Sequence, residues 1–119
     1  MDLSDVPAEL RAPVGAALDA AGVREGHLGV ELVHEGRMRT LNYVHRGVDE
    51  ATDVLAFPID DQPPETGPRE LGDVFICPDH ASDVVEAAVH GTLHLCGYDH
   101  EGDEGEMLAI QEQVMRALR

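Results

Sequence analysis

The sequence contains no lysine, so its eight basic residues are all arginine, and they face 24 aspartate and glutamate residues. The formal net charge is −16 at pH 7. A field of this sign repels polyanions, so any contact with nucleic acid must depend on a local group of positive charges or on a partner. The acidity favours solubility and carries no information about the fold.

Cysteines are also scarce: Cys77 and Cys96 are too few for a disulfide framework. No apolar run is long enough to cross a bilayer, and the N-terminus lacks the basic and then apolar pattern of a signal peptide. We therefore expect a cytoplasmic protein without membrane association. We interpret Cys96 as a buried thiol rather than a fourth metal ligand or a redox group, because it lies in an apolar helical pattern.

The order of hydrophobic patterns predicts an α+β fold in a single domain over residues 1–119. We expect a small mixed sheet of about three to four strands covered by helices, with the metal site on a central helix and the following turn. Compact or alternating apolar runs predict strands at 27–33, 53–57 and 72–77, and helical spacing predicts helices within 3–21, 38–46, 79–96 and after 105. Since Pro13 does not fit a helix interior, the first regular helix is expected to begin near Ala12.

Three histidines mark the most informative stretch, which reads HGTLHLCGYDH from His90 to His100. On a helix, His90 and His94 project from the same face, one turn apart. Gly97 can adopt a positive φ and end the helix, so that the chain reverses and returns His100 to the same point. Three imidazoles leave a coordination position open for water, as in catalytic zinc sites, whereas structural sites are usually closed by four ligands. We predict a zinc site on these histidines, although nickel, copper and iron also accept imidazole.

The spacing is close to the H-E-x-x-H-x-x-G-x-x-H motif of metzincin proteases, with one difference. In those enzymes the residue after the first histidine is the glutamate that acts as general base. Here that residue is Gly91, which has no side chain to move a proton. A metalloprotease is therefore the least favoured of the functions that the motif allows.

Several separated stretches resemble the YbeY family of bacterial metal-dependent endoribonucleases and ribosomal-RNA maturation factors. They follow the family's order from about residue 28 to the end of the chain. Two positions depart from the family pattern: His45 stands where tyrosine is usual, and Ala56 where serine is usual. The matching stretches are Leu41-Asn42 with Arg46-Gly47, TDVLAFP at 52–58, LGDV at 71–74, and HGTLHLCGYDH at 90–100.

The resemblance implies zinc ligands at His90, His94 and His100 and an active-site arginine at Arg46. It also implies cleavage of single-stranded RNA in ribosomal RNA processing, including 3′-end maturation of the small-subunit rRNA, and a role in ribosome quality control. The expected partners are therefore ribosomal RNA and, because the chain is acidic, a docking protein such as a ribosomal protein or a ribosome-associated GTPase.

Phosphodiester cleavage develops charge on non-bridging oxygens, which a guanidinium can bind through two hydrogen bonds, and we assign this role to Arg46. The alternative for Arg46 is a solvent-facing helix end, where it would cap backbone carbonyls. Between residues 34 and 46, three arginines (Arg37, Arg39 and Arg46) accompany a single acid, Glu35. We therefore expect a positive strip that lines the substrate groove.

No general base occupies the expected position. Asp53 and Asp99 are candidates for orienting a ligand imidazole or a water molecule, although aspartate in a turn commonly forms local Asx hydrogen bonds. Alternatively, metal-bound hydroxide needs no separate base, or the RNA 2′-OH is the nucleophile. The leading hypothesis is a zinc-dependent endoribonuclease, and a non-catalytic, zinc-stabilised ribosome assembly factor is the alternative that the acidity and the missing base permit.

Overall fold

A three-stranded mixed sheet lies at the centre of the computed structural model, which describes residues 1–59, 69–99 and 101–118. The strands are β1 (His27–Leu32), β2 (Val54–Pro58) and β3 (Glu70–Ile76), in the order β1-β3-β2. β3 pairs in parallel with β1 and antiparallel with β2. The predicted α+β class and mixed sheet are therefore confirmed, and β1 and β2 form the two edges.

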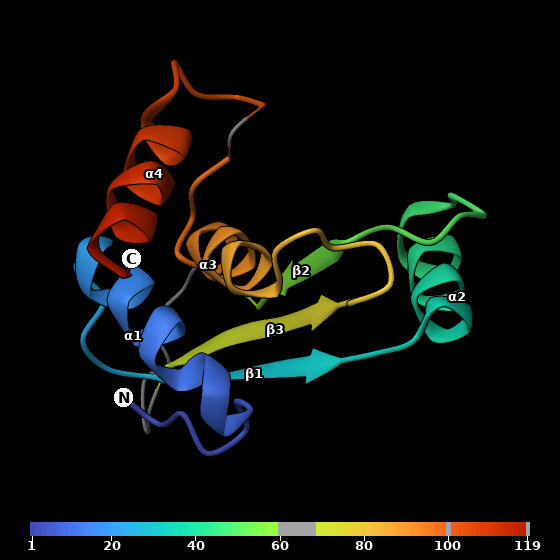
Figure 1. The fold of residues 1–119 in the computed structure, drawn as a ribbon, viewed down its shortest axis with the longest axis horizontal. Coiled ribbons are helices and arrows are strands. Elements are labelled where there is room, and N and C mark those ends of the chain that lie inside the picture. The colour runs from blue at the N-terminus through green and yellow to red at the C-terminus, as the bar shows by residue number, and fades with distance from the viewer. Residues whose placement is uncertain (60–68, 100, 119) are drawn as a thin grey trace.

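Three helices lie on one side of the sheet, and the fourth lies beyond its end (Figure 1). The three are α1 (Arg11–Ala20), α3 (Val84–Leu95) and α4 (Glu106–Leu118), of which α4 packs on α1 and α3, whereas α2 (Glu35–Arg46) stands apart beyond the ends of β1 and β3. A short 3-10 turn at Ala8–Leu10 precedes α1. α1 begins at Arg11, one residue before the predicted start, which places Pro13 in the first turn, where its missing N–H breaks no helical hydrogen bond.

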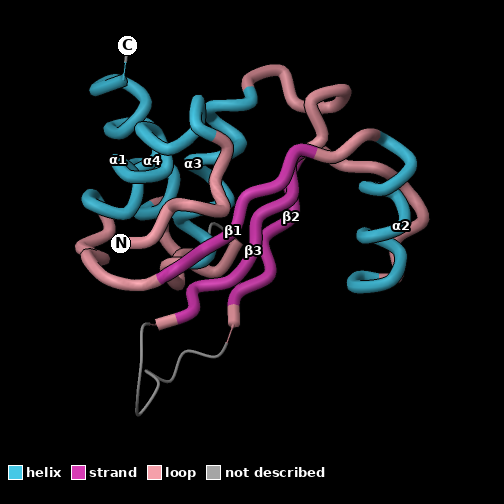
Figure 2. The backbone as a smooth tube through the Cα atoms, turned by 90° about the horizontal axis from the view of Figure 1, so that it is seen from below, coloured by secondary structure: helices cyan, strands magenta, loops and turns pink. Residues whose placement is uncertain are grey.

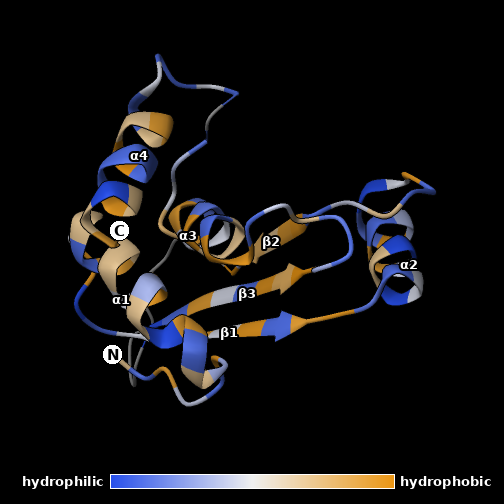
Figure 3. Ribbon diagram, in the orientation of Figure 1, coloured by the Kyte–Doolittle hydropathy of each residue, from blue (hydrophilic) through white to orange (hydrophobic). Residues whose placement is uncertain are grey.

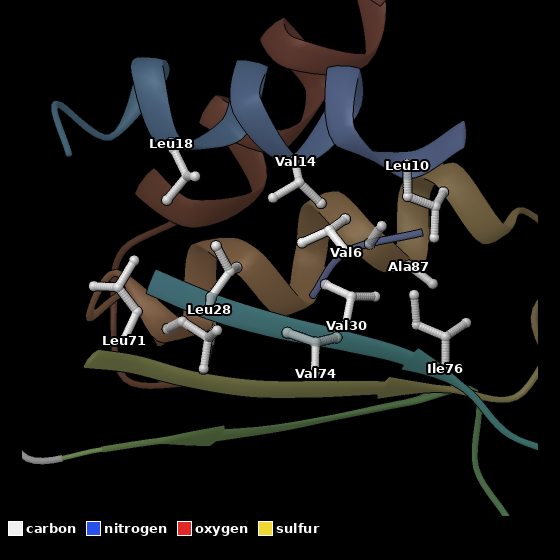
Figure 4. Close-up of a cluster of buried hydrophobic side chains, with 12 residues drawn as sticks. Val6, Leu10, Val14, Leu18, Leu28, Val30, Leu71, Val74, Ile76 and Ala87 are labelled. Carbon is white, nitrogen blue, oxygen red and sulfur yellow. The ribbon is translucent and has the colours of Figure 1, made fainter. Parts of the chain in front are cut away.

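The main core fills the space between α1, α3 and the sheet (Figure 4). Side chains of the N-terminal helical segment point toward alternate residues of β1 and β3, as expected for strands with one face on the core. Full burial of each such aliphatic side chain contributes about 1.5–3 kcal/mol. The residues that make this contact are Leu10, Val14, Leu18, Leu28, Val30, Val74 and Ile76.

The last helix, α4, closes the core from the side of α1 and α3. Helical spacing after residue 105 predicts one face made of Met107, Ile110, Gln111, Val114 and Leu118. Of these, Met107 and Val114 are buried, and Ile110 packs against the same cluster. Leu118, predicted on this face, is instead exposed at the last turn. None of the helices in the described part of the chain is long and apolar enough to cross a membrane.

Among the described residues, α2 packs against the other side of the sheet, near the end of the strands beyond which it lies in Figure 2. There Met38 of α2 is fully buried against Val33, Leu55 and Cys77. The rest of α2 is mostly hydrophilic, as its colouring in Figure 3 shows. α2 is therefore attached to the sheet by a small apolar cluster, and most of its surface faces solvent.

The N-terminal segment is held along the outer edge of β1 by a histidine between two carboxylates. The His27 ring lies 2.6 Å from Asp5 Oδ2 through Nε2 and 2.8 Å from Glu70 Oε2 through Nδ1. These two hydrogen bonds raise the pKa of His27 to about 9, above its ordinary value of 6.5. Next to this group, Val30 N–H donates to Asp5 O at 3.0 Å, an ordinary distance for a backbone hydrogen bond. The edge of β1 is thus covered.

We expect this histidine to make stability depend on pH. Because its folded-state pKa lies above the unfolded value, its contribution is fully present below pH 6.5 and is lost as pH rises through about 9. His27→Gln should remove that contribution, so the difference in the free energy of unfolding between wild type and variant should shrink across this interval. Urea denaturation at a series of pH values measures it.

The control is His34→Gln, at an exposed position that has no ion pair among the described residues. Its difference from wild type should stay constant over the same interval. If the free energies of unfolding of His27→Gln and wild type differ by the same amount at every pH, His27 does not cause the pH dependence.

Candidate active site

Helix α3 carries the two described histidines of the motif, and its start is specified by a local cap. The Asp83 side chain accepts a hydrogen bond from Glu86 N–H at 3.1 Å, which is the capping arrangement expected of an aspartate before the first turn. Ala87, Ala88 and Leu95 then pack into the main core. The buried side of α3 lies on the sheet, and its partly exposed side is left for the histidines.

His90 and His94 lie side by side on that partly exposed side. Their ring centroids are 4.8 Å apart, and the ring planes meet at 76°. Both line a pocket of about 650 Å³ between α3, β2 and the start of α4. The structure confirms the predicted projection of these two histidines from one face of the helix.

Gln111 of α4 orients the first of these rings. Its Oε1 lies 2.8 Å from His90 Nδ1, and its Nε2 lies 3.4 Å from Glu86 Oε1. Since an amide oxygen only accepts hydrogen bonds, the contact places the proton on Nδ1 and the lone pair of the ring on Nε2. Helical spacing groups Gln111 with the apolar residues of the last helix and predicts core packing for it, whereas it lines the pocket. The sequence feature that could have revealed this contact is a polar residue within an otherwise apolar helix face.

The end of α3 has the predicted geometry. Gly97 has φ of 100°, its N–H donates to His94 O at 3.0 Å, and Tyr98 N–H donates to Leu93 O at 3.2 Å. A residue with a side chain rarely adopts this φ, so the glycine ends the helix and turns the chain. The third predicted ligand, His100, lies outside the described residues, but Asp99 and Glu101 on either side of it both line the pocket.

Within residues 1–59, 69–99 and 101–118, no group of three or more histidine, cysteine, aspartate or glutamate side chains is arranged to hold a metal ion. Two neighbouring imidazoles are nevertheless suitable donors for zinc and for related divalent ions. The hydrogen bond from His90 to Gln111 is the outer contact that a ligating histidine normally makes.

Arg46 reaches the same pocket from the end of α2. Gly47, with φ of 72°, ends the helix in the left-handed region, and its N–H donates to Tyr43 O at 2.9 Å. The buried Asn42 side chain then donates to Glu50 O at 2.8 Å and fixes the segment that leads to β2. Arg46 is exposed and makes no ion pair or hydrogen bond with any described residue, so it does not cap the helix end.

The predicted positive strip does not form. Arg37 pairs with Glu31 at 3.3 Å, and Arg39 makes two hydrogen bonds to Asp49, at 2.7 and 2.9 Å. Neither arginine is among the described residues that line the pocket. The prediction counted acids only within residues 34–46, whereas the neutralising carboxylates come from the preceding strand and the following loop.

Asp53 and Asp99 both line the pocket, and each has one carboxylate oxygen in a local turn. Asp53 Oδ1 accepts from Val54 N–H at 2.9 Å and from the Thr52 hydroxyl at 3.2 Å. Asp99 Oδ1 accepts from Glu101 N–H at 3.0 Å. The Asx hydrogen bonds are therefore present, and they leave the second oxygen of each carboxylate without a partner among the described residues.

Gly91 has a packing role that the sequence motif does not reveal. A Cβ at this position would lie 2.5 Å from Val74 Cγ1 and 3.2 Å from Val54 Cγ2. These distances are shorter than van der Waals contact, so α3 can approach the sheet this closely only where the helix has no side chain. A glutamate base of the metzincin kind cannot be accommodated here, which counts against a metalloprotease of that mechanism.

Cys96 is a free thiol, partly buried beside the main core. Burial raises its pKa to about 11, so the thiol is protonated at neutral pH. It does not line the pocket. Because a cysteine ligates metal as the thiolate, this placement supports the interpretation as a core thiol over a fourth ligand.

The fold and pocket together define a small α+β protein that presents two histidines and an exposed arginine to one polar pocket at the edge of its sheet. The model of the family described as Endoribonuclease YbeY matches residues 6–119. The chain therefore belongs to the Endoribonuclease YbeY family.

Individual relatives agree with this assignment, and all are named endoribonuclease YbeY. That of Persephonella marina is 32% identical over 86% of this chain and 76% of its own length. That of Staphylococcus saprophyticus is 37% identical over 78% and 72%, and that of Salinispora tropica is 38% identical over 87% and 82%. An endoribonuclease is a hydrolase that cleaves phosphodiester bonds within an RNA chain.

We expect Gly91→Ala to destabilise the protein by about 1–3 kcal/mol, because the new methyl group would be too close to Val74 of β3 and Val54 of β2. This is the opposite of the gain of up to about 1 kcal/mol that the same change normally gives inside a helix. Urea denaturation measures the difference.

Gly15→Ala in α1 is the matched control, since its Cβ would meet only Leu3 Cδ1, at 4.0 Å. It should be neutral or stabilising. Adding Val74→Ala to Gly91→Ala should cost less than the two single changes combined. Equal effects of Gly91→Ala and Gly15→Ala would show that the close approach of α3 is unimportant.

Proposed function

We propose that the chain is a zinc-dependent endoribonuclease that cleaves single-stranded RNA in the processing of ribosomal RNA. The observation that carries the proposal is the meeting of His90, His94 and Arg46 at one pocket in a chain of the YbeY family. The proposal includes maturation of the 3′ end of small-subunit rRNA and ribosome quality control, and it places the reaction in the cytoplasm, where ribosomal RNA precursors are found.

In this proposal His90, His94 and His100 hold the metal ion. The rings of the first two lie edge to face with their centroids 4.8 Å apart, and the residues flanking the third line the same pocket. Gln111 holds the proton of His90 on Nδ1 and directs the Nε2 lone pair toward the ion. When bound, zinc supplies a Lewis acid that polarises a phosphoryl oxygen and lowers the pKa of water.

The residues of the chain then divide the remaining work. Arg46 binds the non-bridging oxygens of the phosphodiester, because its guanidinium is exposed at the pocket and has no competing carboxylate among the described residues. Asp53 and Asp99 each have a carboxylate oxygen that can orient the attacking water or receive its proton. If the RNA 2′-OH is the nucleophile, the same carboxylates are placed to accept its proton.

The negative charge of the chain affects how substrate arrives. With a net charge of −16 and with Arg37 and Arg39 neutralised by carboxylates, the protein does not attract RNA at long range. The proposal therefore includes a docking partner that brings the enzyme to its RNA, of the kind represented by a ribosomal protein or a ribosome-associated GTPase.

We expect purified, zinc-loaded protein to cleave a single-stranded oligoribonucleotide. His94→Ala should abolish turnover, and Arg46→Ala should lower kcat by about 100-fold or more through the loss of a charged donor to the transition state. Arg39→Ala, which removes an arginine already paired with Asp49, should leave kcat unchanged. Steady-state kinetics with thermal unfolding of each variant provide the measurement.

Analysis of the product ends identifies the nucleophile, because a 2′,3′-cyclic phosphate excludes direct attack by water. A protein that melts at higher temperature with zinc but shows no turnover would instead be the non-catalytic assembly factor. Loss of activity in Arg39→Ala equal to that in Arg46→Ala would contradict the role given to Arg46.

We expect Gln111→Leu to weaken zinc binding by about 10–100-fold, since it removes the acceptor that orients His90. Gln111→Glu keeps an acceptor at the same position and should retain most of the affinity. Competition with a chromogenic chelator measures the dissociation constants.

Gln113→Leu, two residues along α4 and exposed, is the matched control and should bind zinc like the wild type. Unchanged zinc affinity in Gln111→Leu would mean that His90 is not a ligand or that Gln111 does not orient it.

A further inference from the structure

The outer edge of β2 forms one wall of the pocket. β2 is an edge strand of the sheet, and in Figure 1 it lies beneath α3 on the side of β3 away from β1. Val54, Leu55 and Ala56 line the pocket together with His90, His94 and Arg46, and Val54 and Ala56 are partly exposed. Backbone groups on this edge can therefore meet a ligand that lies at the histidines.

The register determines which backbone groups point outward. Cys77 N–H donates to Asp53 O at 2.8 Å, and Ile59 N–H donates to Leu71 O at 3.1 Å. The backbone groups of residues 53 and 59 therefore point toward β3. In an antiparallel pair the hydrogen-bonded residues alternate with residues that face away. Leu55 and Phe57 therefore bond to β3, while Val54, Ala56 and Pro58 direct their backbone groups to the pocket side. Pro58 fits this pattern, because its position needs no ladder N–H.

The outward groups consist mainly of hydrogen-bond acceptors. Val54 N–H already donates to Asp53 Oδ1 at 2.9 Å, and Pro58 has no N–H. The outward N–H of Ala56 and the carbonyls of Val54 and Ala56 meet no partner in residues 1–59, 69–99 or 101–118. The other edge of the sheet differs, since Val30 N–H is bonded to Asp5 O.

One backbone N–H flanked by two carbonyls suits a base of an RNA strand better than its phosphate. A phosphodiester has no hydrogen-bond donor at neutral pH, so the two carbonyls offer it nothing and repel its charge. An unpaired base presents N–H donors beside acceptors on its Watson–Crick edge, which complements a backbone N–H flanked by carbonyls. In a duplex the same edge is already hydrogen-bonded.

We propose that the outer edge of β2, through Ala56 N–H and the carbonyls of Val54 and Ala56, binds the Watson–Crick edge of an unpaired base next to the scissile phosphodiester. This deepens the proposed function, on which it rests, because it makes the edge of the sheet the element that selects single-stranded over double-stranded RNA. The readout belongs to the backbone and does not require a particular side chain at position 56.

Ala56→Pro tests the proposal, since it removes the outward N–H without removing a bond to β3. We expect KM for a single-stranded oligoribonucleotide to rise about tenfold with kcat little changed, as for the loss of one hydrogen bond made in ground and transition states alike. Ala56→Ser keeps the N–H and is the matched control, so its KM should rise much less than that of Ala56→Pro. An Ala56→Pro variant that folds and has unchanged KM overturns the proposal.

Amide hydrogen exchange of the zinc-loaded wild type gives an independent measurement if Ala56→Pro does not fold. An excess of unstructured oligoribonucleotide should slow exchange at Ala56 N–H about tenfold or more and leave Val30 N–H unchanged. The same strand in a duplex, and a strand of abasic ribose phosphates, should not protect Ala56. Protection by the abasic strand, or by an extended peptide but not by RNA, overturns the proposal in favour of phosphate or peptide binding.

Failure of base binding at the edge of β2 can be distinguished from failure of the proposed nuclease activity. If RNA is cleaved and His94→Ala abolishes cleavage, but neither KM nor exchange responds at Ala56, the edge proposal is wrong and the nuclease stands. If zinc-loaded protein cleaves no RNA but an unpaired strand protects Ala56, the enzymatic proposal is wrong and base binding at the edge stands.

Discussion

The close approach of α3 to the sheet at Gly91 is the constraint on which the site depends. The helix lies so near β3 and β2 that a single methyl group at this position would overlap Val74. His90 directly precedes this glycine, and His94 follows it by less than a turn. The distance between α3 and the sheet at Gly91 therefore determines how far both rings stand from β2. A bulkier residue would lift the helix and with it both histidines, away from Arg46 and from the backbone of β2.

Charge pairing makes Arg46 different from its neighbours. The described part of the chain neutralises Arg37 and Arg39 with carboxylates from outside α2, so the surface around the pocket gains little positive charge from them. Arg46 has no such partner among the described residues, and it stands at the end of α2, where a glycine in the left-handed region stops the helix. In an acidic protein, a guanidinium that lies at a pocket without a carboxylate partner offers an anion a local binding site, whereas the paired arginines do not build a broad basic surface.

Much of this arrangement could be predicted from local pattern. Hydrophobic periodicity located all three strands and the four helices, and the spacing of His90, His94 and Gly97 predicted a shared helical face and a glycine stop that the structure confirms. The same reasoning failed where the answer lay in distant contacts. Arg39 meets Asp49 across a loop, and Gln111 meets His90 from another helix. Neither contact has a periodic signal, since each depends on how separate elements pack.

The contact between Gln111 and His90 also ties the chemistry to the packing of the C-terminal helix. α4 is held by Met107 and Val114 against α1 and α3, and Gln111 lies between these anchors in sequence, one turn from each. The apolar anchors therefore set the position of the amide oxygen, and the amide oxygen sets the tautomer and direction of the imidazole. Since the Gln111 amide also donates to Glu86 through Nε2, the first turn of α3 helps to hold the amide that orients the His90 ring. The orientation of His90 is thus a property of the assembled helical layer and not of the histidine motif alone, because the residue that fixes it comes from a helix outside the motif.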